Sequence, residues 1–157
     1  TGSPELVGGS EPLYVKLARG QPGDRFHPTI ILDTAFAPSK VFTSHMGGCV
    51  RCFTTLDLPY LRAGELWRYT PYAPKCHVLR LAYRPSDDRL VGSEWAYGDT
   101  SAQDKLVTWN IHNGEVVRSV LLSRDDDRDF CLAGRVFIGS DRSVMSTFDG
   151  SIVGKLE

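Results

Sequence analysis

The sequence has no long hydrophobic run, because none of its apolar stretches approaches the roughly 18 residues of a membrane-spanning helix. It also has no excess of either charge: 18 lysines and arginines stand against 19 aspartates and glutamates, for a net charge of −1 over 157 residues. Nucleic-acid footprints and polybasic membrane patches both need clustered positive charge. We therefore expect neither nucleic acid nor membrane among the partners of this chain.

Cysteine is scarce, since four residues in a chain of this length are too few for a disulfide-built scaffold. One alternative is a zinc-binding β-rich module, whose candidate ligands are Cys49, Cys52, Cys76 and either His77 or His45. Adjacent residues such as Cys76 and His77 point to opposite faces of a strand, and residues 49–53 read as an extended segment. We therefore favour small buried thiols in a reduced intracellular protein, cytoplasmic or nuclear, with no metal and no cofactor.

Common catalytic signatures are missing as well. The sequence contains no Gly-rich phosphate loop, no Gly-x-Ser-x-Gly elbow and no His-Glu-x-x-His pair. This omission agrees with a protein that is not an enzyme, which is our expectation. A third hypothesis is a small β-rich hydrolase with an active thiol at Cys76 or Cys131.

Short extended runs are what the chain does contain. Residues 1–28 are rich in Gly, Ser and Pro and include one predicted strand near Tyr14. Across residues 29–157, β-branched and aromatic runs alternate with Gly, Asp, Ser and Pro, and no stretch sustains a helical period over three turns. This pattern predicts an all-β fold.

Four strand signals recur three times in the same order. The segment 35–39 (AFAPS) returns 47 residues later as 82–86 (AYRPS). The second strands are predicted at 41–44, 90–93 and 136–140, the third at 50–53, 106–109 and 145–148, and the fourth, each after a glycine turn, at 64–68, 114–118 and 150–154. In the third copy, the first strand is predicted at 129–132. The repeats span about 29–69, 77–121 and 129–157, and we expect each to form an antiparallel four-stranded sheet that packs against the next.

At these residues the chain resembles the WD-repeat family of β-propellers, most clearly in the second copy. Cys76-His77 stands where the family has Gly-His, and Trp109-Asn110 stands where it has Trp-Asp. The resemblance implies a hydrogen-bonded structural set, here His77, Ser93, Asp104 and Trp109. The first copy has Phe53 in place of the tryptophan, and the third keeps Phe148-Asp149.

The resemblance also implies a function, because WD-repeat propellers are mostly non-catalytic platforms that hold peptides and proteins. Family topology places the connections between blades, and those between second and third strands, on one face. Those segments, including an enlarged loop expected at 94–99, hold the residues that we predict to bind a partner: Tyr72, Trp95, Tyr97, Asp125, Asp126 and Asp127. Aromatic rings and carboxylates favour a partner that presents Lys or Arg.

A complete propeller needs at least about four blades, and the sequence predicts three. The chain is therefore expected to be an incomplete propeller or part of a larger ring. An open arc exposes the apolar faces of its end blades, so self-association that completes the ring is a further expectation.

Overall fold

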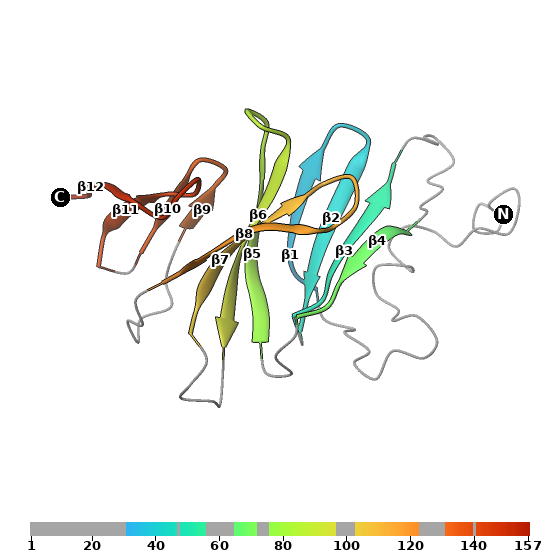
Figure 1. The fold of residues 1–157 in the computed structure, drawn as a ribbon, viewed down its shortest axis with the longest axis horizontal. Coiled ribbons are helices and arrows are strands. Elements are labelled where there is room, and N and C mark those ends of the chain that lie inside the picture. The colour runs from blue at the N-terminus through green and yellow to red at the C-terminus, as the bar shows by residue number, and fades with distance from the viewer. Residues whose placement is uncertain are drawn as a thin grey trace, which may run out of the picture.

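The computed structural model describes residues 31–46, 48–55, 65–71, 76–96, 103–122, 131–139 and 141–157. These residues form twelve β-strands in three four-stranded antiparallel sheets, which follow one another along the molecule (Figure 1). Within these ranges there is no helix of the length and apolar character needed to cross a membrane. The Gly, Ser and Pro-rich segment 1–28, with its predicted strand, lies outside the described residues.

Each sheet is a meander in which consecutive strands are neighbours. The first sheet contains β1 (Ile31–Ala37), β2 (Lys40–His45), β3 (Val50–Thr54) and β4 (Glu65–Tyr69). The second contains β5 (Cys76–Arg84), β6 (Arg89–Ala96), β7 (Lys105–Asn110) and β8 (Val116–Leu121). The third contains β9 (Cys131–Ala133), β10 (Val136–Ile138), β11 (Ser143–Ser146) and β12 (Ile152–Lys155). The prediction of an all-β fold made of four-stranded antiparallel blades is confirmed.

The glycine turns that precede β8 and β12 have the same hydrogen bonds. The Gly114 amide donates to the Asn110 carbonyl, and the Gly150 amide donates to the Ser146 carbonyl, each at 2.9 Å. Both glycines have positive φ angles, 74° and 76°, a region that side chains disfavour. The sequence repeat therefore reflects a repeated turn geometry.

This equivalence corrects one detail of the predicted repeat. Phe148 was expected to end the third strand of its copy, in the place of Trp109, but β11 ends at Ser146 and Phe148 lies in the turn. The counterpart of Trp109 is Met145, because each follows a register shift and pairs with the first residue of the next strand. An aromatic residue near a strand end does not by itself reveal on which side of the turn it lies.

The main hydrophobic core lies between the first and second sheets. Its members come from both sheets and from the turn after β7: Ala35, Phe42, Val50, Cys52, Trp67, Val78, Leu81, Leu90, Val107, Trp109 and Ile111. Phe42 and Trp109 are completely buried. Alternate residues of each strand supply this face, as expected for sheets that pack face to face.

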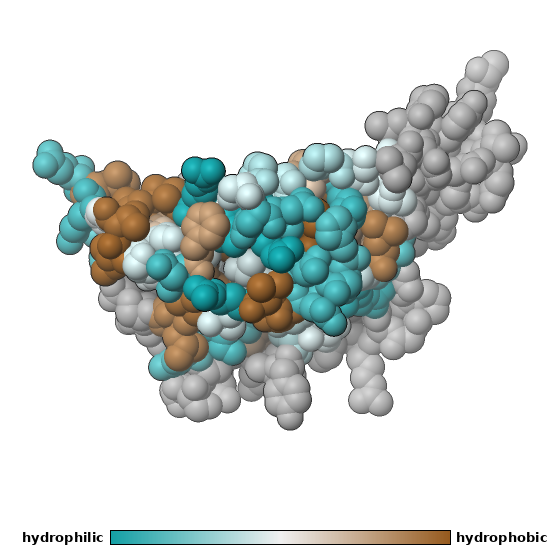
Figure 2. All heavy atoms as spheres, turned by 45° about the horizontal axis from the view of Figure 1, so that its top comes forward, coloured by the Kyte–Doolittle hydropathy of each residue, from teal (hydrophilic) through white to brown (hydrophobic). Residues whose placement is uncertain are grey.

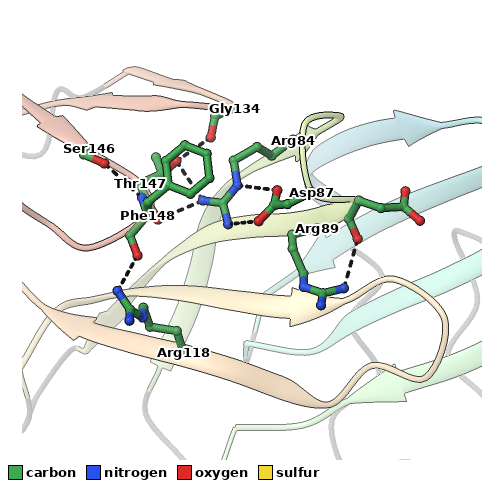
Figure 3. Close-up of polar contacts among 9 residues, drawn as sticks. Arg84, Asp87, Arg89, Arg118, Gly134, Ser146, Thr147 and Phe148 are labelled. Carbon is green, nitrogen blue, oxygen red and sulfur yellow. Dashed lines mark hydrogen bonds and ion pairs between the residues drawn. The ribbon is translucent and has the colours of Figure 1, made fainter.

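In the first and second sheets, a side chain of the fourth strand reaches the turn of the following sheet. In β4, Trp67 donates from Nε1 to the Ile111 carbonyl at 2.8 Å, and its indole covers Gly114. In β8, Arg118 has the corresponding register position and donates to the Phe148 carbonyl at 2.6 Å (Figure 3). The same device, with two different side chains, therefore fastens both junctions.

The junction of the second and third sheets also contains a buried arginine (Figure 3). Arg84, only 3% exposed, donates from Nε and Nη2 to the two carboxylate oxygens of Asp87, each at 2.7 Å. Its Nη1 donates to the carbonyl and the hydroxyl of Thr147 in the third sheet, at 2.9 and 3.0 Å. The guanidinium lies 3.9 Å from the centroid of the Phe148 ring. The buried charge is thus fully paired, as a buried guanidinium requires.

Candidate binding surface at the loop end

The strand ends that flank the connections between sheets and those between second and third strands lie at one end of the molecule, which we call the loop end (Figure 1). The turn after β2 lies directly against the residues that flank the β4–β5 connection. A Cβ on Gly48 would lie 2.5 Å from Pro71 Cγ and 2.7 Å from the Cys76 carbonyl oxygen. Gly48 has a φ of 84°, so glycine serves both the turn and the close approach.

Much of the predicted partner surface falls on these connections. Five of its six predicted residues lie outside the described residues: Tyr72, Tyr97, Asp125, Asp126 and Asp127. The strand ends that carry their connections are described, namely Tyr69, Cys76, Ala96, Lys105 and Leu121. Trp95 is the predicted partner residue whose position the structure gives.

Trp95 lies in strand β6 and not in an enlarged loop. The expectation for residues 94–96 is therefore wrong, because β6 continues to Ala96 and pairs with the start of β5. Trp95 is directly opposite His77 in this pairing, and the two ring centroids are 5.7 Å apart. Burial lowers the pKa of His77, so its ring is neutral at neutral pH. The partly buried Trp95 ring is thus supported on one side by a neutral imidazole.

A buried carboxylate lies one residue before Trp95, on the opposite face of β6. Glu94 is 5% exposed and accepts a hydrogen bond from the Tyr69 hydroxyl at 3.1 Å. It also accepts one from the Cys76 thiol. Burial, followed by the charge of Glu94, raises the pKa of Cys76 to about 11, and the same two causes raise the pKa of Tyr69. Both groups therefore stay protonated as hydrogen-bond donors to the carboxylate.

Sequence reasoning did not find this cluster. Tyr69 and Glu94 are 25 residues apart and belong to different sheets, so no local pattern joins them. The weak available signal is that Glu94 interrupts a run that is otherwise apolar or small, at a strand position whose neighbours on the same face are buried.

The four residues of the predicted structural set are placed differently from the hydrogen-bonded chain that the resemblance implies. Trp109 Nε1 and Ser93 Oγ are both buried, and neither has a hydrogen-bond partner among the described residues. Asp104 accepts instead from the Ala96 amide at 3.1 Å, while His77 lies against Trp95. Trp109 packs its indole against Gly92 and the Tyr69 ring. Packing, rather than a hydrogen bond to Ser93, holds this tryptophan.

The described cysteines do not form a metal site. Within the described ranges, no three or more His, Cys, Asp or Glu residues come together in a way that could hold a metal ion. Cys52 belongs to the hydrophobic core, where burial raises its pKa to about 12. The zinc alternative is therefore not supported, because Cys52 faces the core between two sheets while Cys76 hydrogen-bonds to Glu94.

The thiol-hydrolase hypothesis loses its support at Cys76. A catalytic thiol needs a lowered pKa to supply thiolate, whereas a pKa of about 11 leaves on the order of one molecule in ten thousand ionised at pH 7. The side chain of Cys131, the other candidate, lies outside the described residues.

Three meandering four-stranded sheets, each packed against the next and fastened at a repeated glycine turn, define a partial β-propeller with WD-like blades. Comparison with solved structures agrees. The chain is similar to the C-terminal WD40 domain of Sif2 (TM-score 0.54, 13% identity, 83% of this chain) and to BamB from Moraxella catarrhalis (TM-score 0.51, 12% identity, 84% of this chain).

The computationally designed Ika4 protein is also similar, with a TM-score of 0.52 and 14% identity over 89% of this chain and 78% of Ika4. The chain spans 39% of the Sif2 domain and 38% of BamB, so it corresponds to less than half of either structure. No protein-family model and no curated protein matches the sequence.

Proposed function

We propose that this chain is a non-catalytic interaction scaffold that binds a peptide or protein presenting Lys or Arg at its loop end. The observation that carries the proposal is the position of Trp95, a partly buried aromatic ring held against His77 where β6 reaches this end. A supported aromatic ring binds with little loss of conformational entropy and attracts cations over its face.

Charge near this ring supports a cationic partner. Asp104 lies at the far side of the β6–β7 connection, fixed by its hydrogen bond from the Ala96 amide. The connection after β8 contains Asp125, Asp126 and Asp127, and we include these carboxylates in the proposed surface together with Tyr72 and Tyr97. Acidic groups of this kind would select for Lys or Arg and accelerate encounter.

We also propose that the protein is intracellular, in the cytoplasm or nucleus. Cys52 and Cys76 are free and buried, which supports a reducing compartment.

The test compares binding of a synthetic Lys/Arg-rich peptide with that of its Glu-substituted and neutral counterparts, measured by calorimetry. The Trp95→Ala change is expected to weaken binding of the basic peptide at least about tenfold, as for an interface anchor. Trp95→Phe should retain most of the affinity because the ring remains. Val117→Ala, at a position 54% exposed on β8, is the matched control and should bind normally.

Two results would contradict the proposal. One is unchanged binding by a Trp95→Ala protein whose unfolding curve matches that of the parent chain. The other is equal binding of the basic and acidic peptides, which would remove the role of charge.

A further inference from the structure

Because the three sheets have the same strand order, equivalent faces of the three can be compared residue by residue. In the first two sheets, we call the face that points toward the next sheet along the chain the following face. In the third sheet, the name applies to the equivalent face. Phe42 and Cys52 lie on the following face of the first sheet, and both are completely buried. Their register counterparts in the second sheet, Val91 and Thr108, are 0% and 4% exposed. The following face is therefore buried in both sheets on which a further sheet packs.

The third sheet has the same apolar following face, and no further sheet of the described residues covers it. Ile138 and Val144, the counterparts of Phe42 and Cys52, are only partly buried. Leu156, two residues after Gly154 and on the same face, is 48% exposed. Figure 2 shows apolar residues gathered at the end of the molecule that the third sheet forms. An exposed apolar face of this kind marks an interaction surface.

One position on this face is unlike its counterparts. Trp67 and Arg118, which reach across the two existing junctions, correspond in register to Gly154 in β12. A Cβ built on Gly154 would meet nothing within 4 Å. The third sheet therefore has no side chain at this position that could extend across a junction. A docked partner would have to fill this space with a side chain of its own.

A second copy of the chain does not offer a matching surface. The complementary surface would be the opposite face of a first sheet, because Leu90 and Trp109 on that face of the second sheet pack against the first. In the first sheet this face is already closed: Val41, Thr43 and Phe53 are 2%, 0% and 0% exposed. Head-to-tail closure by identical chains would have to uncover it.

We infer that the following face of the third sheet is a docking site for a further four-stranded antiparallel blade from outside residues 31–157, with a bulky side chain that fills the space over Gly154. The inference does not depend on binding at the loop end. Two observations support it: the counterpart residues are buried at both existing junctions, and no other described sheet covers this face of the third sheet.

The test supplies such a blade to the full chain. A second copy of residues 70–122 is appended after Glu157, because this segment already docks on a following face through Leu90 and Trp109. We expect the urea midpoint of unfolding to rise by about 1 M or more, because burial of an apolar face increases the free energy of unfolding. Val144→Glu, on the following face, should cancel the rise when compared with the original chain carrying the same change. Ile152→Glu, which pairs with Met145 on the other face of the sheet and is 71% exposed, should not.

A second variant tests the space over Gly154. In the extended chain, the appended turn carries glycine at the position of Gly114, so the space stays empty. Gly154→Trp restores the counterpart of Trp67 and should raise the midpoint further in the extended chain, with no rise in the original chain.

Other outcomes would overturn the inference. An extended chain with an unchanged midpoint would mean that the face does not accept a blade. If light scattering instead finds the original chain dimeric, and Val144→Glu makes it monomeric, the occupant is a second copy and our choice of partner is wrong.

Discussion

At the residue scale, Gly92 shows how closely the second sheet is packed. A Cβ at this position would lie 2.7 and 2.9 Å from Trp109 Cζ3 and Cη2, and 3.1 Å from the Arg80 carbonyl oxygen. Trp109 is completely buried and Arg80 contributes backbone, so neither has an easy way to move. The resemblance to WD repeats predicted a structural role for Trp109, and its contacts with Gly92 and Tyr69 show how packing supplies that role.

We expect Gly92→Ala to destabilise the protein by about 1–3 kcal/mol, the usual cost of overpacking a filled core. Gly154→Ala is the matched control, because its added methyl group meets nothing within 4 Å. Its free energy of unfolding should not fall. Urea unfolding followed by tryptophan fluorescence measures both, and equal stabilities for the two variants would show that Trp109 can move aside.

At the element scale, the two junctions use one geometry with different chemistry. Ala37 and Arg84 both end the first strand of their sheets, and Ile111 and Thr147 hold the same position in the glycine turns. The first junction is apolar at this point. The second is built on a guanidinium that Asp87 and Thr147 share, so its strength depends on charge.

Because its strength depends on charge, the second junction should become weaker at low pH. Hydrogen bonds from Arg84 lower the pKa of Asp87 in the folded chain. The pair therefore stabilises the fold above the unfolded carboxyl pKa of about 3.9, and this contribution is lost as pH falls through the lower folded value.

Between pH 5 and pH 3 we expect the urea midpoint of the parent chain to fall more steeply than that of Asp87→Asn. Glu157→Gln, which removes an exposed carboxylate, should keep the parental slope. Parallel slopes for the parent chain and Asp87→Asn would mean that Asp87 contributes no pH-dependent stability. Because Asp87 is 36% exposed, the difference should be modest and should decrease with added salt.

At the scale of the whole molecule, the sheets differ in how many neighbours cover them. The second sheet has a packed sheet on both sides, since β5 contacts β1, β2 and β9. The third is covered on one side, and all four residues of β12 are exposed. Local opening is easiest where few buried contacts hold an element.

Amide hydrogen exchange should therefore be slowest in β6 and β7 and fastest in β12. Arg84→Gln should accelerate exchange in β10 and β11 more than in β2 and β3, because it removes the hydrogen bonds to Thr147. Equal protection of the second and third sheets would show that the chain opens as a single unit.

The sequence alone determined the class of fold and the order of its strands. Alternating short apolar runs and recurrent glycine turns are local features, and each blade is one meander of neighbouring strands, so local patterns describe it well. The prediction that residues 49–53 form an extended segment was sufficient to locate β3 (Val50–Thr54).

Only the tertiary structure decided the contacts between sheets. The Tyr69–Glu94 and Arg84–Thr147 hydrogen bonds join residues 25 and 63 positions apart, and side chains of one sheet meet those of another only after both have folded. The same limit explains why Trp95 was expected in a loop: its strand is extended by pairing with His77, which the local sequence around Trp95 does not contain. Which apolar face is covered and which is left open depends likewise on neighbouring sheets, and the open one at β12 became visible only when all three were in place.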